Sequence, residues 1–171
     1  MLRRVISGGQ TGADLAGLLA ARKVGIETGG WIPKGWLTEL GPRPVLKKLG
    51  LREHTSDKYP PRTKQNILDS DATLIIAEHL DRGSALTRDL CYRLHKPVFH
   101  ISLNDMEDSE RTVQEVVHWL EKRHVQVINI AGNRESRSPG LQRQATTFLT
   151  KLFSVLQRMP TTSPLFRGRK R

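Results

Sequence analysis

The stretch Ser7-Gly8-Gly9-Gln10-Thr11-Gly12 decides how this chain is expected to fold. Residues 3–7 lead into it as a short segment typical of a buried strand, and residues 11–24 follow it with leucines and alanines at helical spacing. Gly25 then provides a helix stop. The sequence therefore predicts a strand, a tight glycine-rich turn and a helix at its N-terminus.

The composition of this turn favours an anion-binding site. Gly9 allows the backbone to approach a phosphate, Gly12 allows the helix to pack closely on the strand, and a helix N-terminus supplies free N–H groups and partial positive charge. Gly8, Gln10 and Thr11 complete the candidate site, while Asp14 is expected either to bind a ligand hydroxyl or amine or to cap the helix. A tight turn that simply needs small residues is the structural alternative.

Strands and helices continue to alternate along the rest of the chain. Strands are predicted at residues 73–77, 98–101 and 126–130. Helices are predicted at residues 61–69 and at about 139–158. A further helix begins at Gly83 and stops at Lys96-Pro97, and another begins after a cap at Asp108-Ser109. Residues 28–36 are expected to form a loop with at most one short strand, followed by a short helix at 44–49 and a brief strand at 51–54. This alternation predicts an α/β domain with a parallel sheet and helices on both faces.

Two further turns follow predicted strands and would meet the first turn at the carboxyl edge of the sheet. In the segment 83–87, Gly83, Ser84 and Thr87 either add a second anion cradle or only cap their helix. Polar residues in the segment 129–140 can close the same crevice, with intersubunit ion pairing as the competing interpretation; the candidates are Gly132, Arg134, Glu135 and Ser136.

A third group of candidates lies on the first turns of the helix after Pro60-Pro61. Arg62, Thr63 and Asn66 either contact the ligand or cap this helix, and the residues favour neither interpretation. Cys91 is expected in or beside the core rather than as a nucleophile, and the scattered histidines outline no metal site. We therefore predict no catalytic and no metal-binding residues.

The overall composition limits the class of protein. The chain has 171 residues, 37% of them hydrophobic, which predicts one domain at residues 1–159 and a basic, disordered tail at 160–171. The lone cysteine and the lack of a long apolar run predict a cytoplasmic protein without a membrane anchor. A net charge of +11 predicts an acidic partner, and the tail is expected to give non-specific nucleic-acid binding.

Several of these motifs together resemble the putative molybdenum carrier family, which is related to the YpsA-like SLOG proteins. The resemblance spans residues 5–156 and is carried by Ser7 to Asp14, Gly30-Trp31-x-Pro33-Lys34-Gly35, Arg62-Thr63-x-x-Asn66, Asp71-Ala72-Thr73 and Ala131-Gly132-x-Arg134-Glu135-Ser136-x-x-Pro139-Gly140. It implies a Rossmann-like three-layer α/β/α fold, a homotetramer, and binding of molybdenum cofactor (molybdopterin) without chemical conversion. In that case residues 8–12 would hold phosphate or oxo groups, Ser84 and Thr87 would form the second cradle, and residues 134–136 would close the far side.

The sequence thus predicts a carrier for molybdenum cofactor rather than an enzyme. The alternative is a nucleotide-binding SLOG-type sensor or a phosphoribohydrolase-like N-glycosidic hydrolase, with Asp14 or Glu135 assisting at the sugar. The proline-glycine-glycine-x-glycine-threonine motif of those hydrolases is absent, and the segment 83–87 is a poor version of it.

Overall fold

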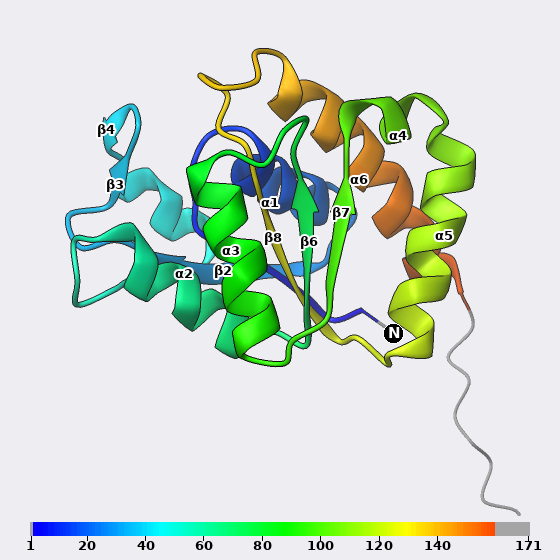
Figure 1. The fold of residues 1–171 in the computed structure, drawn as a ribbon, viewed down its shortest axis with the longest axis horizontal. Helices are drawn as coiled ribbons and strands as arrows, with labels where there is room; N and C mark the ends of the chain where they lie inside the picture. Colours follow the sequence, from blue (N-terminus) through cyan, green and yellow to red (C-terminus); the bar gives the residue numbers. More distant parts are fainter. Residues whose placement is uncertain (1, 160–171) are drawn as a thin grey trace, which may run out of the picture.

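A computed structural model describes residues 2–159, which form one six-stranded parallel sheet with helices on both faces. The strand order is β5-β2-β1-β8-β6-β7, and each neighbouring pair is parallel. Strands β8, β6 and β7 lie side by side in Figure 1. The predicted fold class is therefore confirmed. The strands are β1 (Arg4–Ser7), β2 (Glu27–Ile32), β5 (Leu51–Glu53), β6 (Ala72–Ile76), β7 (Val98–Ile101) and β8 (Val127–Gly132).

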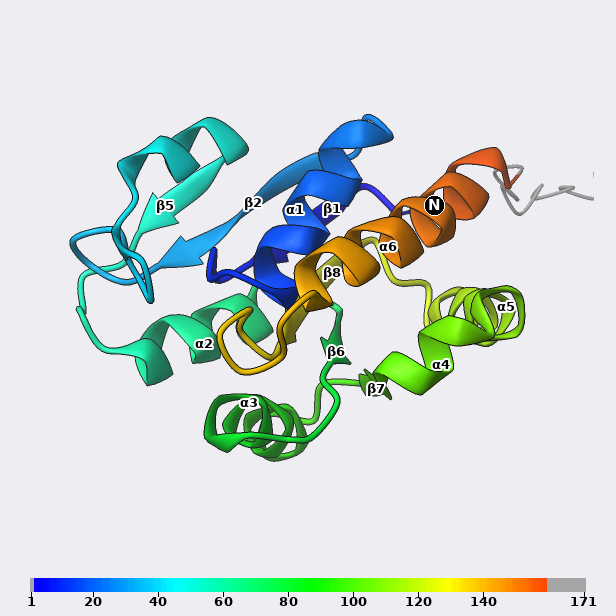
Figure 2. The same cartoon turned by 90° about the horizontal axis from the view of Figure 1, so that it is seen from above.

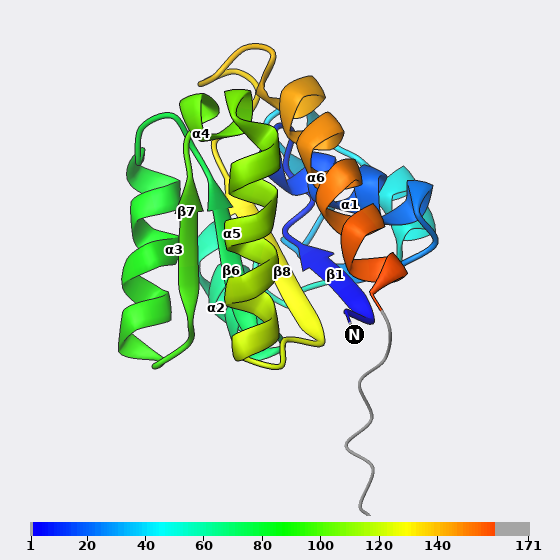
Figure 3. The ribbon, with the colours of Figure 1, turned by 90° about the vertical axis from the view of Figure 1, so that its right-hand side faces the viewer.

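The helices make the two outer layers. One face of the sheet carries α1, α5 and α6, and the other carries α2 and α3, as Figures 2 and 3 show from two directions. A short 3₁₀ helix, η1 (Pro44–Leu49), precedes β5. The remaining helices are α1 (Ala13–Lys23), α2 (Tyr59–Leu68), α3 (Arg82–Arg93), α4 (Leu103–Glu107), α5 (Ser109–Lys122) and α6 (Leu141–Arg158).

The main core lies between the sheet and the layer of α1, α5 and α6. Every residue of β6 is buried, as expected for a central strand of a parallel sheet, and Phe148, Leu152 and Phe153 of α6 pack into the same cluster. Gly17 brings α1 against β8, because a Cβ atom there would lie 2.7 Å from Cβ of Ile130. This close approach fixes the start of α1 at the carboxyl edge of the sheet.

The stretch at residues 28–36, expected as a loop with at most one short strand, contains most of a six-residue strand. Residues Glu27–Ile32 form β2, which pairs with β1 and β5. Gly30 has a φ of 121°, and a Cβ there would collide with the carbonyl oxygen of Ser7, so a glycine that looks like a loop signal is what lets this strand pass. The composition does not show the full extent of this strand. Strand β2 uses glycines for close backbone packing and does not show the alternation of apolar and polar residues that is typical of a strand.

Other boundaries and two small elements also differ from the expectations. Strand β8 continues through Gly132, α2 begins at Tyr59, and α6 begins at Leu141. The short hairpin β3 (Leu37–Thr38) and β4 (Gly41–Pro42) and helix α4 were not predicted. The predicted tail at 160–171 lies outside the described residues. Within residues 2–159, no helix is long and apolar enough to cross a membrane.

Candidate functional site

A small cleft opens between α2 and α3, at the carboxyl ends of β1 and β8. Its volume is about 80 Å³. In parallel α/β sheets, ligands bind outside the carboxyl ends of the strands, where the strand order reverses. The lining residues come from the glycine-rich turn, α2, the start of α3 and the end of β8: Gly8, Gln10, Asp14, Tyr59, Arg62, Thr63, Asn66, Gly83, Leu86, Thr87, Asn129, Ala131, Gly132 and Arg134.

Positive charge exceeds negative charge among the ionised groups of this lining. Nη1 of Arg62 lies 3.8 Å from Oδ2 of Asp14, and both side chains are buried. The guanidinium of Arg134 lies 4.8 Å from the ring centroid of Tyr59, and that of Arg62 lies 5.6 Å from the same centroid. Two guanidinium groups therefore face a single carboxylate, so the cleft retains one positive charge for an anionic ligand.

Burial shifts the titration of the Arg62–Asp14 pair. Loss of solvation raises the pKa of Asp14, against the opposing influence of Arg62, the Gln10 amide and Arg134. Loss of solvation likewise lowers the pKa of Arg62, against the opposing influence of Asp14. A guanidinium is too basic to release its proton in proteins, so Arg62 stays charged and its attraction for the carboxylate keeps the pair together.

Two buried N–H donors in the cleft have no acceptor among residues 2–159. They are Nε of Arg62 and Nε2 of Gln10, on side chains that are 8% and 4% exposed. The Gln10 amide is held in one orientation, because its Oε1 accepts a hydrogen bond of 3.0 Å from the backbone N–H of Glu39. Buried donors without acceptors are costly and uncommon in folded proteins, so these two indicate a place for a ligand.

The backbone amides of the glycine-rich turn are largely engaged by the chain itself. The N–H of Gly12 donates to Oε1 of Gln142 at 3.1 Å, that of Ala13 donates to the carbonyl oxygen of Asn133 at 3.1 Å, and that of Gln10 donates to Oδ2 of Asp14 at 3.3 Å. A Cβ at Gly12 would collide with the Asn133 carbonyl. The turn's own backbone therefore leaves few hydrogen-bond donors for a ligand.

The start of α3 is capped by a carboxylate. Oδ1 of Asp81 accepts hydrogen bonds from the N–H and the hydroxyl of Ser84, both at 2.8 Å, and the Thr87 hydroxyl donates to the Gly83 carbonyl at 3.0 Å. Although burial opposes it, these bonds lower the pKa of Asp81, so the cap is charged. Gly83 and Thr87 line the cleft, but Ser84 serves its own helix, which is the capping interpretation of this motif.

The segment after β8 contributes less to the cleft than its composition suggested. Gly132 and Arg134 line it. The carboxylate of Glu135 instead caps α6, accepting from the N–H groups of Gly140 at 2.6 Å and Gln142 at 2.8 Å. The Ser136 hydroxyl donates to the Glu39 carboxylate.

The α2 candidates also divide between ligand and structural roles. The Thr63 hydroxyl donates to the carbonyl of Tyr59 at 3.0 Å within the helix. The Asn66 amide accepts from the Trp31 N–H at 2.8 Å and donates to the Trp31 carbonyl at 3.1 Å, so it acts as a strand partner for β2. Of these three residues, Arg62 alone offers a buried donor without an acceptor in the described part of the chain.

Comparison with known proteins gives the family. The family model described as circularly permutated YpsA SLOG matches residues 5–153, which is most of the chain. The chain belongs to the circularly permutated YpsA SLOG family. A crystal structure of a putative molybdenum carrier protein from Syntrophus aciditrophicus SB is 41% identical, with a TM-score of 0.81 over 89% of this chain and 94% of that one. No curated protein matches the chain.

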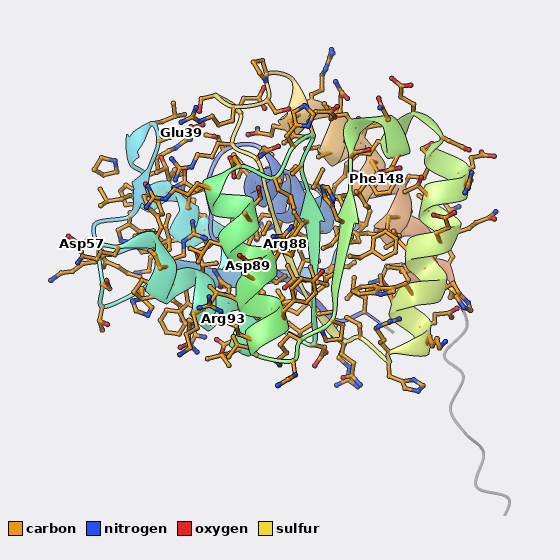
Figure 4. The ribbon with its side chains drawn as sticks, in the orientation of Figure 1. Glu39, Asp57, Arg88, Asp89, Arg93 and Phe148 are labelled. Carbon is orange, nitrogen blue, oxygen red and sulfur yellow. The ribbon has the colours of Figure 1, made fainter. Side chains whose placement is uncertain are left out.

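Two residues of this circularly permutated YpsA SLOG protein join the site without any signal in the sequence. The ring of Tyr59 lies beside the guanidinium groups of both cleft arginines. Glu39, labelled in Figure 4, reaches from the β3–β4 hairpin to accept hydrogen bonds from the hydroxyls of Thr11 and Ser136. Ser136 is 97 positions from Glu39, so only the folded chain reveals the contact. The sequence places Tyr59 three residues before Arg62, but nothing in the sequence indicates that the ring points toward the cleft arginines.

No group of three or more His, Cys, Asp or Glu side chains within residues 2–159 is arranged to hold a metal ion. Cys91 is fully buried in α3, and burial raises the pKa of its thiol, so the prediction of a core cysteine is confirmed.

Proposed function

We propose that the cleft binds the phosphate of a small molecule and that this molecule is molybdenum cofactor, carried without chemical conversion. One observation carries the proposal: the buried N–H groups of Arg62 and Gln10 lack acceptors in a cleft whose ionised groups leave one positive charge. The relationship to a structure named a molybdenum carrier favours this cofactor over other phosphate esters.

The size of the cleft decides which part of the cofactor it can receive. A volume of about 80 Å³ has room for several water-sized groups, whereas a pocket that encloses a drug-sized ligand measures about 300–1,000 Å³. A phosphate group fits inside, and a pterin does not. Arg62, Gln10 and Arg134 would hold the phosphate through charge-assisted hydrogen bonds, for which guanidinium groups are well shaped.

The terminal phosphate thus anchors the cofactor to the protein. When bound, the cofactor contributes an oxidisable dithiolene, and the benefit of a carrier is to keep that group from reacting before delivery. The protein residues described above supply charge and donors for binding, and the proposal assigns them no bond-making step.

A nucleotide is the second candidate ligand, because its phosphate would satisfy the same donors. The observation in favour of a nucleotide is Asp14. Burial raises the pKa of this carboxyl group, and such a group can serve as the general acid or base that an N-glycosidic hydrolase requires. In that reading the protein would release free base from nucleoside monophosphates.

The test begins with protein purified anaerobically and analysed by mass spectrometry for bound pterin and molybdenum. Gln10→Glu keeps the acceptor for the Glu39 N–H but replaces the free donor with negative charge, so bound pterin should fall at least about 100-fold, near 2.7 kcal/mol. Gln114→Glu makes the same change on the exposed surface of α5 and should retain the wild-type amount.

Three outcomes separate the hypotheses. Pterin present in the wild type and in Gln114→Glu but lost in Gln10→Glu supports the carrier. Equal pterin in all three proteins rejects this cleft as the site. Release of base from nucleoside monophosphates at a catalytic rate would replace the carrier with the hydrolase.

A further inference from the structure

Asp14 places a carboxylate inside a cleft that otherwise attracts anions. Its side chain is 5% exposed and lines the cleft. The Gln10 N–H reaches its Oδ2 at 3.3 Å, Nη1 of Arg62 reaches the same atom at 3.8 Å, and the Gly8 backbone N–H also acts on the carboxylate. An ionised carboxylate has about four lone-pair positions and can only accept hydrogen bonds, so Asp14 keeps acceptor capacity for a ligand.

An acceptor of this kind distinguishes tetrahedral anions by their protons. Inorganic phosphate carries at least one proton at neutral pH, and a phosphate monoester gains one near its second pKa of about 6. Sulfate and molybdate carry none at neutral pH. A protonated phosphate can donate to Asp14 while its other oxygens accept from Arg62 and Gln10, whereas an unprotonated anion sets its lone pairs against those of the carboxylate.

We propose that Asp14 is a specificity-determining residue that accepts a hydrogen bond from a proton of the phosphate and excludes unprotonated oxyanions, sulfate and free molybdate among them. This inference rests on the proposed function, since it concerns the same cleft. It adds that this cleft takes up no molybdenum as molybdate, and that a molybdenum ligand enters it only through a phosphate ester that carries one proton.

A simpler role for Asp14 is that of counter-ion to Arg62, and it predicts a different pattern. Removing a negative charge from the cleft would then strengthen binding of every anion by a similar factor. A role in selection instead changes the ratio of affinities between phosphate and sulfate. The ratio is therefore the decisive quantity.

The experiment is calorimetric titration of the full chain with sodium phosphate, sulfate and molybdate at about pH 8.5, where all three are dianions and only phosphate keeps a proton. One ionic strength is used throughout, which holds screening constant. The wild type should prefer phosphate to both other anions by at least about tenfold. Asp14→Asn removes the charge and presents an amide that can also donate, so the preference should fall to within about threefold, mainly through tighter sulfate binding. Asp89→Asn makes the same change at a half-buried position of α3 that does not line the cleft (Figure 4), and it should keep the wild-type ratio.

Equal wild-type affinities for phosphate and sulfate would overturn the selection by Asp14 while leaving the anion site intact. An Asp14→Asn protein that binds all three anions more tightly by one common factor would also overturn it, in favour of the counter-ion role. Failure of the wild type to bind any of the three would overturn the proposed function as well. If Asp14→Asn does not fold, the wild-type ratio alone still decides whether the cleft selects phosphate.

Discussion

The guanidinium of Arg62 occupies the space that a side chain at Gly8 would need. A Cβ built on Gly8 would collide with Nη1 of Arg62, although the Gly8 backbone adopts a conformation open to any residue. Gly8 is therefore required for room rather than for backbone freedom. The glycine-rich turn and the Arg62-Thr63-x-x-Asn66 motif, distant in the sequence, form one unit in which the turn accommodates the arginine.

Gly8→Ala should displace Arg62 without changing any charge. The new methyl group pushes the guanidinium off the turn, which moves a donor away from the ligand and disturbs its pairing with Asp14. We expect phosphate affinity to fall about tenfold, near 1.4 kcal/mol, and the free energy of unfolding to fall by about 1–3 kcal/mol. Titration calorimetry and urea denaturation measure the two effects.

The control for this change is Gly25→Ala, at the far end of α1. Gly25 has a φ of 79° with no atom within 4 Å of its Cβ position, so alanine there is strained by roughly 1–2 kcal/mol without contacting the cleft. This variant should lose stability and retain phosphate affinity. A matching loss of affinity in Gly25→Ala would mean that the Gly8→Ala effect reflects general destabilisation.

The architecture of this fold was largely predictable because its signals are local. The β-branched run at β6 and the helical periodicity of α5 and α6 each identify an element without knowledge of its neighbours. Strand β2 was expected only as a short strand within a loop, because its glycines serve close backbone packing against β1 and glycines in a sequence are typical of loops. The homotetramer, the cytoplasmic location and nucleic-acid binding by residues 160–171 remain predictions.

Arg62→Met should make the stability of the protein more sensitive to pH. Burial already raises the pKa of Asp14 above 3.8, and loss of the guanidinium removes the main opposing influence. Above pH 3.8 the unfolded chain releases this proton while the folded chain retains it. The contribution of Asp14 to stability is therefore greatest below 3.8 and is lost as the pH rises through the folded pKa. The loss approaches about 1.4 kcal/mol per pH unit within that window.

Urea denaturation at pH 4 and pH 7 tests this pH dependence. The difference in stability between wild type and Arg62→Met should be larger at pH 7. Arg88→Met removes the half-buried partner of Asp89 on α3 (Figure 4), where a solvent-accessible ion pair contributes about 1 kcal/mol or less. It should show the same small effect at both pH values. An Arg62→Met deficit that is equal at both pH values would show that Asp14 and Arg62 are not coupled.

Asn66→Ala should destabilise the fold even without any ligand. The pairing of β2 with β1 ends at Gly29, and the Asn66 amide pairs with the N–H and the carbonyl of Trp31 beyond that point. Alanine would leave these two backbone groups without the Asn66 side chain as a partner. The expected cost is about 1–3 kcal/mol in urea denaturation. Gln65→Ala removes an exposed bond to Asp69 on the same helix and should change stability by less than about 0.5 kcal/mol. Wild-type stability in Asn66→Ala would show that the residue serves only the ligand.

The site was predicted less completely than the fold because residue type does not reveal direction. Glu135 and Ser84 have the chemistry of ligand-binding residues, yet the chain uses the first to cap α6 and the second within the cap of α3. Arg62, equally consistent with either role in the sequence, is the one that keeps an unused donor in the cleft. Which polar groups remain free depends on the partners that tertiary structure brings to them.

Glu39→Gln should loosen the hairpin that fixes Gln10. The Glu39 carboxylate accepts from the hydroxyls of Thr11 and Ser136 on different oxygens, and its own N–H orients the Gln10 amide. Glutamine offers one acceptor oxygen and no charge, so at least one charge-assisted bond is lost. We expect faster hydrogen exchange in residues 37–42 and 133–138, together with phosphate affinity reduced about threefold, near 0.7 kcal/mol.

The pH dependence distinguishes stabilisation of the hairpin by the Glu39 carboxylate from stabilisation by apolar packing. Burial works against ionisation of Glu39, but bonds from Ser136 and Thr11 lower its pKa below 4.5. The stabilisation is therefore complete above 4.5 and is lost as the pH falls through the lower folded pKa. Exchange protection, corrected for intrinsic rates, should decline in the wild type at that acid end and be low throughout in Glu39→Gln. Glu115→Gln, in an exposed pair on α5, should behave as wild type. If neither the substitution nor acid changes the exchange protection of the hairpin, then apolar packing, and not the Glu39 carboxylate, holds the hairpin over the glycine-rich turn.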